Sequence, residues 1–502
     1  MNKIYNMNKL TKSLLIAGLA FIFQISYSQE FKKLTLDEVI QIAEEQSPNA
    51  MIAKHTFRAA YWQYRTFVAE YRPSLTLTGT TPSYSRAYER FGDPATGQYR
   101  YVETNTMTNL GSLALSQNIG MTGGSVNVKS DFTLQNDFST TASTPRQYIT
   151  TPISVGLIQP LFRFNSLKWQ KKTEPLKYET AKKTFITAIE NVHISAVQSF
   201  FGLALAQINK QIADRNYNNA DTLYKIAKGR YELGTIAEGD VLDMQLSFLN
   251  AGTALNEAAM NLSDREIRLR SFLGYNETVR IELIIPDFVP DLELKTQDVV
   301  DLAMENNPEI LNQQLKLLTA ESSVAQAKAE KGLNANLTAS FGLNQRTTDF
   351  ATSYQNPNQT QKVNIGFTLP ILDWGLGRGR YKMAQSSQEL TQVQVDQALV
   401  DFEQNLMLDV QQFNLQKVMV ATAALSDTVA QKMYEVTKQR FLIGKIGVLV
   451  LNNADTKKDQ NRRAYVQALQ NYWNYFYNIR YMTLYDFINN KPLETDYDKL
   501  LQ

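Results

Sequence analysis

The side chains that most often carry chemistry are scarce in this sequence. The chain has no cysteine, which excludes disulfides, thiolate metal sites, a cysteine nucleophile and a lipid-bearing cysteine. The two histidines, His55 and His193, have no second ligand at metal spacing, and we predict that His193 is a packed residue of a long helix. No nucleophile and base come together in a recognisable motif. We therefore predict no catalytic residue, no metal site, no cofactor and no enzymatic activity.

One glycine-rich segment superficially looks like a phosphate loop. Gly375-Leu-Gly-Arg-Gly-Arg380 lacks the Gly-Lys-Ser/Thr ending of such loops and follows a strand of alternating polarity. We interpret it as a junction between a strand and a helix. The 51 basic and 49 acidic residues give a net charge of +2, which provides no field for nucleic acid or an acidic substrate.

The elements that surround these residues occur twice along the chain. At an offset of about 260 residues, Glu38–Thr80 aligns without a gap with Asp298–Ser340. Each copy reads as a helix, a strand region, a very long helix, a turn and a further helix. We predict repeat 1 over 29–287 and repeat 2 over 288–502, so that one architecture is built from two similar halves.

The N-terminal segment has the pattern of a secretory signal peptide. Three lysines precede the apolar run Leu14–Phe23, and Ser26 and Ser28 are small residues placed for cleavage before Gln29. A membrane anchor is the alternative, but the run is roughly half of the ~20 residues that a membrane-spanning helix needs. We predict a signal peptide over 1–28.

The strand regions alternate between apolar and polar residues. Such alternation is predicted over 74–85, 150–159, 335–346 and 361–370. Strands of roughly 9 to 11 residues with one apolar and one polar face are typical of a membrane β-barrel. A soluble sheet with one face on a core has the same alternation. The signal peptide and the length of the neighbouring helices favour the membrane.

The first copy contains an excess segment that reads as an additional hairpin over 107–136. Apolar residues alternate with polar ones on either side of the glycine-rich turn Gly120–Gly124. From the residues alone, this hairpin either joins the wall of a barrel or folds over its outer mouth. Joining the wall raises the strand count of one chain from four to six.

The predicted helices are too long for a globule. Ser166–Glu232 and Gly375–Phe441 each form a helix of roughly 55 to 65 residues, on the order of 90 Å long. With the helices that follow their turns, these segments cover 166–275 and 375–487. Apolar residues at alternating steps of three and four predict a coiled-coil seam on both long helices. A solvated bundle or stalk has similar helices but leaves the alternating strands unexplained.

Together these features closely resemble the TolC-type outer membrane efflux family. The resemblance covers nearly everything after the signal peptide. It rests on the leading helices with Pro48 and Pro308, on Leu161-Phe162 after Pro160 and Ile371-Leu372 after Pro370, and on the turns Arg230-Tyr-Glu-Leu-Gly234 and Arg440-Phe-Leu-Ile-Gly444.

The resemblance implies a mostly α fold with membrane β, in which a trimeric β-barrel continues into a long α-helical coiled-coil barrel. The homotrimer would lie in the outer membrane and extend into the periplasm. It would be the passive exit duct of a tripartite efflux or type I secretion system, coupled to an inner-membrane pump through a periplasmic adaptor (membrane fusion) protein. Four strands per chain imply twelve in the trimer, and six imply eighteen.

The resemblance also assigns roles to the turns between the long helices. Arg230, Gly234, Arg440 and Gly444 would lie at the periplasmic tips, where the adaptor docks. A solvated arginine that complements the helix dipole is the alternative for both arginines. Glycine suits these turns because a helix that reverses direction needs a left-handed residue.

The family carries acidic gate residues just beyond these turns, and this chain keeps them only in its first copy. Asp240 and Asp243 are present there, whereas Val450 and Asn453 stand at the matching positions of the second copy. We expect the gate to close by apolar packing and an asparagine ring, with Asp240 as a secondary site.

A soluble periplasmic coiled-coil scaffold or adaptor is the competing interpretation, and it needs no strands that face lipid. The sequence does not choose between drugs, metals and secreted proteins as cargo, nor does it identify the pump.

Overall fold

The computed structural model describes residues 31–92, 97–139, 146–275, 279–286, 288–443 and 445–501, so the predicted signal peptide lies outside the described residues. The chain divides into two compact units. The first contains the described residues up to Thr56, Lys183–Asn307 and those from Glu403 onward, and the second contains Phe57–Lys182 and Pro308–Phe402. Each unit therefore takes corresponding segments from both sequence copies.

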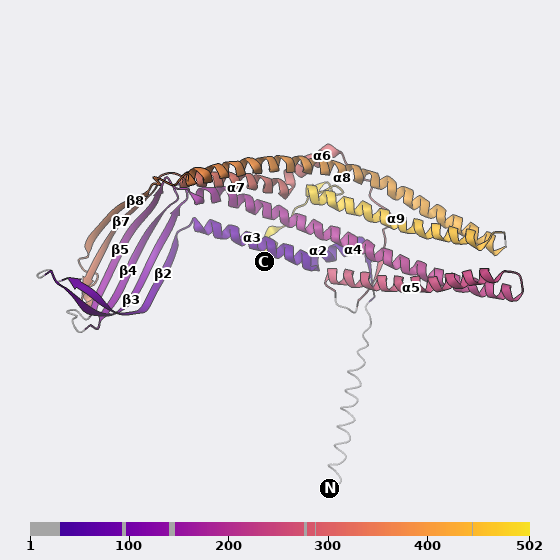
Figure 1. The fold of residues 1–502 in the computed structure, drawn as a ribbon, viewed down its shortest axis with the longest axis horizontal. Coiled ribbons are helices and arrows are strands. Elements are labelled where there is room, and N and C mark those ends of the chain that lie inside the picture. Colours follow the sequence, from indigo (N-terminus) through magenta and orange to yellow (C-terminus); the bar gives the residue numbers. More distant parts are fainter. Residues whose placement is uncertain are drawn as a thin grey trace, which may run out of the picture. The chain divides into compact units, whose positions relative to one another are not determined.

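The main helices form two series of equal length (Figure 1). The first series is α2 (Leu36–Gln46), α3 (Pro48–Glu70), α4 (Ser166–Glu232) and α5 (Glu238–Leu273), with 11, 23, 67 and 36 residues. The second is α6 (Thr296–Asn306), α7 (Pro308–Glu330), α8 (Leu376–Leu442) and α9 (Val448–Thr483), with the same four lengths. These lengths confirm the internal duplication. None of the described helices is both long enough and apolar enough to cross a membrane.

Local sequence explains where the leading helices start. Thr35 caps α2: its hydroxyl accepts the Glu38 N–H, and the Glu38 carboxylate accepts the Thr35 N–H at 2.8 Å. Pro48 and Pro308 are the first residues of α3 and α7, where a missing N–H leaves no bond unmade. The prolines therefore separate each leading helix from the next instead of bending one continuous helix.

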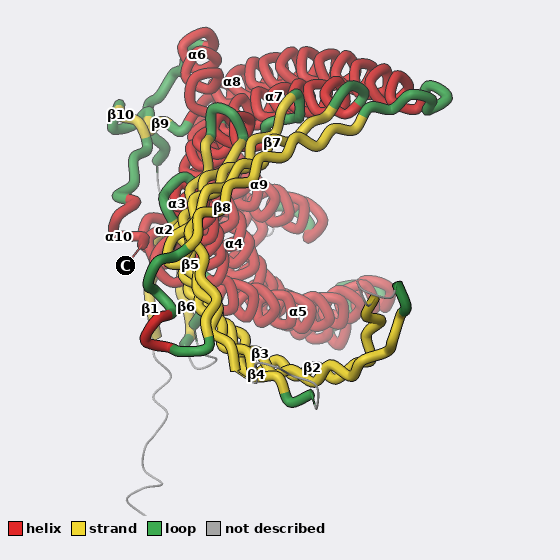
Figure 2. Tube along the Cα trace, turned by 90° about the vertical axis from the view of Figure 1, so that its left-hand side faces the viewer, coloured by secondary structure: helices red, strands yellow, loops and turns green. Residues whose placement is uncertain are grey.

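The second unit holds one antiparallel sheet. Its strands are β2 (Ser74–Gly92), β3 (Tyr99–Ile119), β4 (Gly124–Asp137), β5 (Arg146–Leu161), β7 (Asn334–Thr347) and β8 (Asn358–Thr368), in the order β2-β3-β4-β5-β7-β8. The first strand runs past the predicted end at residue 85. The predicted hairpin forms β3 and β4, which lie inside the sheet between β2 and β5. Figure 2 shows that the sheet is curved.

Two small two-stranded sheets complete the first unit. β1 (Phe31–Thr35) pairs in parallel with β6 (Arg280–Ile284), and β9 (Tyr485–Asp486) pairs with β10 (Lys491–Pro492). The short elements that complete the described chain are η1 (Phe350–Thr352) and α10 (Tyr497–Leu501).

The core of the first unit lies along the predicted helical seams. Phe200 and Leu203 of α4 and Leu406 of α8 are completely buried, which confirms the seam at these positions. The rings of Phe413 and Tyr472 lie 5.3 Å apart, so α8 packs on α9 through aromatic side chains.

Candidate functional site

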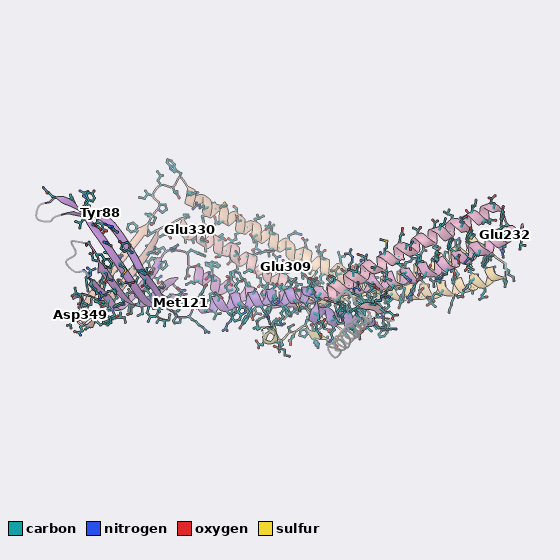
Figure 3. The ribbon with its side chains drawn as sticks, turned by 90° about the horizontal axis from the view of Figure 1, so that it is seen from below. Tyr88, Met121, Glu232, Glu309, Glu330 and Asp349 are labelled. Atoms are coloured by element: carbon teal, nitrogen blue, oxygen red, sulfur yellow. The ribbon has the colours of Figure 1, made fainter. Side chains whose placement is uncertain are left out.

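The two predicted tip turns lie at the same end of the first unit (Figure 1), where Figure 3 labels Glu232 at the end of α4. In the first turn Gly234 has φ of +71°, and its N–H donates to the Tyr231 carbonyl at 2.8 Å. The Thr235 N–H donates to the Arg230 carbonyl at 2.9 Å. This is the bonding pattern of a helix that ends on a left-handed glycine.

The second turn repeats one of these bonds. The Lys445 N–H donates to the Arg440 carbonyl at 2.9 Å, as Thr235 does to Arg230. Gly444 lies outside the described residues. The side chains of Arg230 and Arg440 are exposed, and both are available to a partner.

The predicted gate residues occupy matching positions of the two following helices. Asp240 and Val450 are each the third residue of their helix, and Asp243 and Asn453 are each the sixth. All four are exposed in the single chain. The Ala237 N–H donates to Asp240 Oδ2 at 3.3 Å, so Asp240 caps α5, a role that Val450 has no group to fill in α9.

A buried ionic cluster in the first unit was not predicted from the sequence. Glu190 of α4 is 2% exposed, and Arg480 of α9 donates to both of its oxygens, at 3.0 and 3.1 Å. Arg480 Nη1 also lies 3.1 Å from Asp486 Oδ2. His193 lies between two carboxylates, with Nδ1 3.3 Å from Glu190 Oε1 and Nε2 3.3 Å from Glu44 Oε2. The cluster therefore connects α2, α4, α9 and β9.

The cluster shifts the pKa of several members. Burial by itself would lower the pKa of His193, but the carboxylates of Glu190 and Glu44 outweigh it and raise the pKa to about 9. Burial would raise the pKa of Glu190, yet His193 and Arg480 hold it below its usual range. For Glu44, the contact with His193 lowers the pKa. His193 is therefore a cation at neutral pH.

His193 is buried, as its seam position predicts, but the prediction missed its charge. Glu190 and His193 are three residues apart and therefore lie on one helix face, and this spacing could have predicted their contact from the sequence. Arg480 comes from a helix 290 residues away along the chain, and no local pattern links it to Glu190.

A second polar layer joins the two copies within the first unit. Arg215 of α4 donates to Asp459 of α9 at 3.0 Å, and Asn216 donates to the same carboxylate at 3.2 Å. Lys458 is buried, with its Nζ 3.6 Å from the ring centre of Tyr434 in α8. Because each cation has an anionic or aromatic partner, the layer fixes the packing of α4, α8 and α9 on one another.

The described part of the chain offers no metal centre. No group of three or more His, Cys, Asp or Glu side chains there is arranged to hold a metal ion. The Gly375 segment is a helix start: the N–H groups of Gly375 and Gly377 donate to Asp373 at 2.9 and 2.8 Å.

Comparison with known proteins matches both repeats to one family. The family described as "Outer membrane efflux protein" matches residues 123–275 and 299–482. Outer membrane protein TolC of Escherichia coli is 24% identical over 253 residues, which are 47% of this chain and 49% of TolC. The match thus spans about half the length of that relative.

Solved structures share the fold over most of the chain. The CmeC outer membrane channel of Campylobacter jejuni has a TM-score of 0.65 at 17% identity, covering 92% of this chain and 88% of CmeC. The outer membrane protein VceC of Vibrio cholerae has a TM-score of 0.61 at 14% identity, covering 89% and 95%. The fold described above is therefore shared with two independently solved structures.

Proposed function

The chain belongs to the outer membrane efflux protein family, and from that premise we propose that three copies form a passive exit duct through the outer membrane. The duct serves a tripartite efflux or type I secretion system. An inner-membrane pump supplies the energy, and a periplasmic adaptor couples the two. The chain itself catalyses no reaction.

The observation that carries this proposal is the apolar side of the six-stranded sheet. Val363, Ile365 and Phe367 alternate along β8 and are 68%, 65% and 73% exposed. A sheet that exposes a regular apolar face to water would aggregate, whereas lipid makes the same face stable. The sheet therefore supports a membrane wall and not a soluble scaffold.

A second exposed seam on α8 supports assembly from several copies. It comprises apolar side chains at heptad spacing that are more than half exposed in the single chain: Leu408, Leu415, Val418, Leu425, Val429 and Val436. The seam is separate from the buried one that contains Leu406 and Phe413. A second copy of the chain covers it in the proposed trimer.

Membrane fractionation tests the duct against the soluble scaffold. We expect the mature protein to stay with the outer membrane after washes with high salt and carbonate. It should also run as a detergent-resistant trimer on gels until heated. A protein released by these washes as a soluble particle would rule out the duct and support the scaffold.

For coupling, we propose that Arg230 and Arg440 dock the adaptor. The double substitution Arg230→Asp with Arg440→Asp is expected to weaken adaptor binding about tenfold, because each exposed charge pair contributes up to ~1 kcal/mol. Site-specific crosslinking of the adaptor at the tips measures the change.

The chain provides a matched control for this experiment. Lys228 and Lys438 are exposed and lie two residues before the arginines in the two copies. Lys228→Asp with Lys438→Asp changes the charge equally and should leave crosslinking near the wild-type level. Equal losses from both double variants would show that only net charge matters.

For the gate, we propose that Val450 and Asn453 close the periplasmic end without an anionic ring. Conductance of the wild-type channel should respond weakly to a trivalent cation such as hexamminecobalt. Val450→Asp with Asn453→Asp should create strong block, since three chains would then add six carboxylates to those of Asp240 and Asp243. The isosteric control is Val450→Thr. Strong block of the wild type that only replacement of Asn453 relieves would contradict this gate.

A further inference from the structure

The hairpin β3–β4 is an integral part of the sheet. It lies between β2 and β5, paired with β2 from Ser74 opposite Ser116 to Gly92 opposite Tyr99, and with β5 from Ser125 opposite Ile158 to Asn136 opposite Arg146. The second copy has no such insertion, because β7 pairs directly with β8. Removing β3 and β4 from the first copy would leave the same two-stranded arrangement, so the hairpin widens the sheet.

The apolar face of the sheet continues onto the inserted strands. Residues paired in register point to the same side of a sheet. One apolar row crosses five strands in register: Leu75, Leu115, Val128, Val155 and Phe341. A second row starts in the inserted strand β4: Val126, Leu157, Ala339 and Val363. The hairpin therefore has the lipid-facing pattern of the strands on either side.

The opposite face is polar over the same strands. Lys129 lies in register with Ser154. The neighbouring row contains Asn127, Gly156, Ser340 and Lys362. Lys129 also lies 2.9 Å from Asp131 on this face. A hairpin folded over the mouth of a barrel would have water on both sides and would need no such division.

The turn of the hairpin is fixed to the helices that flank the sheet. Figure 3 shows Met121 at the end of the sheet nearest Glu330, opposite the end that carries Tyr88 and Asp349. Asn165, just before α4, donates to the carbonyls of Gly120 and Met121, both at 3.1 Å. The Gln117 side chain donates to the Tyr71 carbonyl after α3 at 2.9 Å. The β3–β4 turn thus has fixed partners on the same side as the strand–helix junctions.

We propose that each chain contributes all six strands to the wall, so that three chains build a barrel of eighteen strands (three times six) instead of twelve. This inference rests on the proposed trimeric duct. With strands ~4.8 Å apart and tilted by about 40°, eighteen strands give a backbone diameter on the order of 36 Å, against about 24 Å for twelve.

The wider barrel sets the class of cargo that the outer section admits. Side chains occupy about 5 Å on the inner side of the wall, which leaves an opening on the order of 25 Å. Two packed helices, each about 10 to 12 Å across, fit such an opening. The outer section therefore passes bulky cargo such as peptides and partly folded polypeptides, and its polar lining keeps the passage wet.

Single-cysteine labelling tests the wall directly, since the chain has no native cysteine. Probes at Val128→Cys and Asn127→Cys report the two faces of β4, and probes at Val155→Cys and Ser154→Cys on β5 are the matched controls. We expect lipid-borne quenchers to reach the labels at 128 and 155, and water-soluble quenchers those at 127 and 154. A label at 128 that only the water-soluble quencher reaches would overturn the eighteen-stranded wall.

Polymer exclusion provides a second measurement. Polyethylene glycols added on the extracellular side of a planar bilayer report the outer opening. A variant without Tyr99–Ser139 should have a polymer size limit of roughly half the wild-type limit, since subtracting the side chains leaves openings of about 14 and 26 Å. An unchanged limit would contradict the wall. If that variant does not assemble, the labels alone decide. The mass of the protein after chemical crosslinking of its copies separates the two proposals. A protein that is not trimeric would refute the duct. An intact trimer with a water-exposed label at 128 would refute only the wider barrel.

Discussion

Arg480→Ala is expected to lower the free energy of unfolding by about 3 to 5 kcal/mol, the usual effect of removing one partner from a buried ion pair. Arg480 donates two hydrogen bonds to Glu190, which is 2% exposed, and its loss leaves that carboxylate with His193 alone. Urea titration in detergent, followed by tryptophan fluorescence, measures the change. Trp473 is a suitable probe because it is buried on the same helix.

The matched control is an arginine whose ion pair is exposed. Arg268 lies 2.8 Å from Asp264 one helical turn earlier on α5, and both side chains face solvent. Arg268→Ala should change the urea midpoint very little, since solvent screens such pairs. Equal shifts for the two variants would mean that burial of the Glu190 carboxylate does not matter. Arg480→Lys should retain part of the stability, because an ammonium group supplies the charge but not the two-pronged geometry.

Stability should fall as the pH rises from about 6.5 to about 9, because over this range the unfolded chain loses the imidazole proton that folded His193 still holds. Its pKa in the folded state is raised from 6.5 to about 9, so protonation favours the folded state. The contribution is complete below about pH 6.5 and is lost as the pH rises through about 9. The difference corresponds to about 3 kcal/mol. Urea titrations at intervals between pH 6 and pH 10 measure it.

His193→Gln removes the titrating group and separates this effect from others. The variant should be less stable than wild type at pH 6, while the two should converge at pH 10. His55 is exposed on α3 and lies outside the cluster, so His55→Gln should leave the pH profile unchanged. A wild-type profile that stays flat across this range, or a His193→Gln profile that keeps the same slope, would contradict the assignment.

The cluster also attaches the segment before α3 and the segment after α9 to α4. Glu44 belongs to the leading helix and Asp486 to the segment after α9, and both reach α4 through His193 or Arg480. In the proposed duct, these contacts would hold the segments before α3 and after α9 against α4. Loss of the cluster should therefore affect assembly as well as the stability of one chain.

Several features could be predicted from the sequence because they depend on neighbouring residues. The lengths of the two long helices follow from the scarcity of breakers: α4 contains one proline, Pro175, near its start, and α8 contains none. The two series of equal length reflect the duplication. Period-two alternation marked the strands, and the glycine of the first tip turn has the left-handed conformation that its position requires.

The long-range arrangement depended on which segments meet in space. Alternation showed that 107–136 forms a hairpin, but only pairing with β2 and β5 decided that it lies within the sheet, since an isolated hairpin has the same period. Likewise, the position of His193 on a seam predicted its burial, whereas its charge depends on Glu190 on its own helix and on Glu44, which comes from a distant part of the chain. Periodicity and chain breakers are local properties that the sequence displays directly. Which strands pair and which charged side chains meet in the interior depend on contacts between distant segments, and only the tertiary structure shows these contacts.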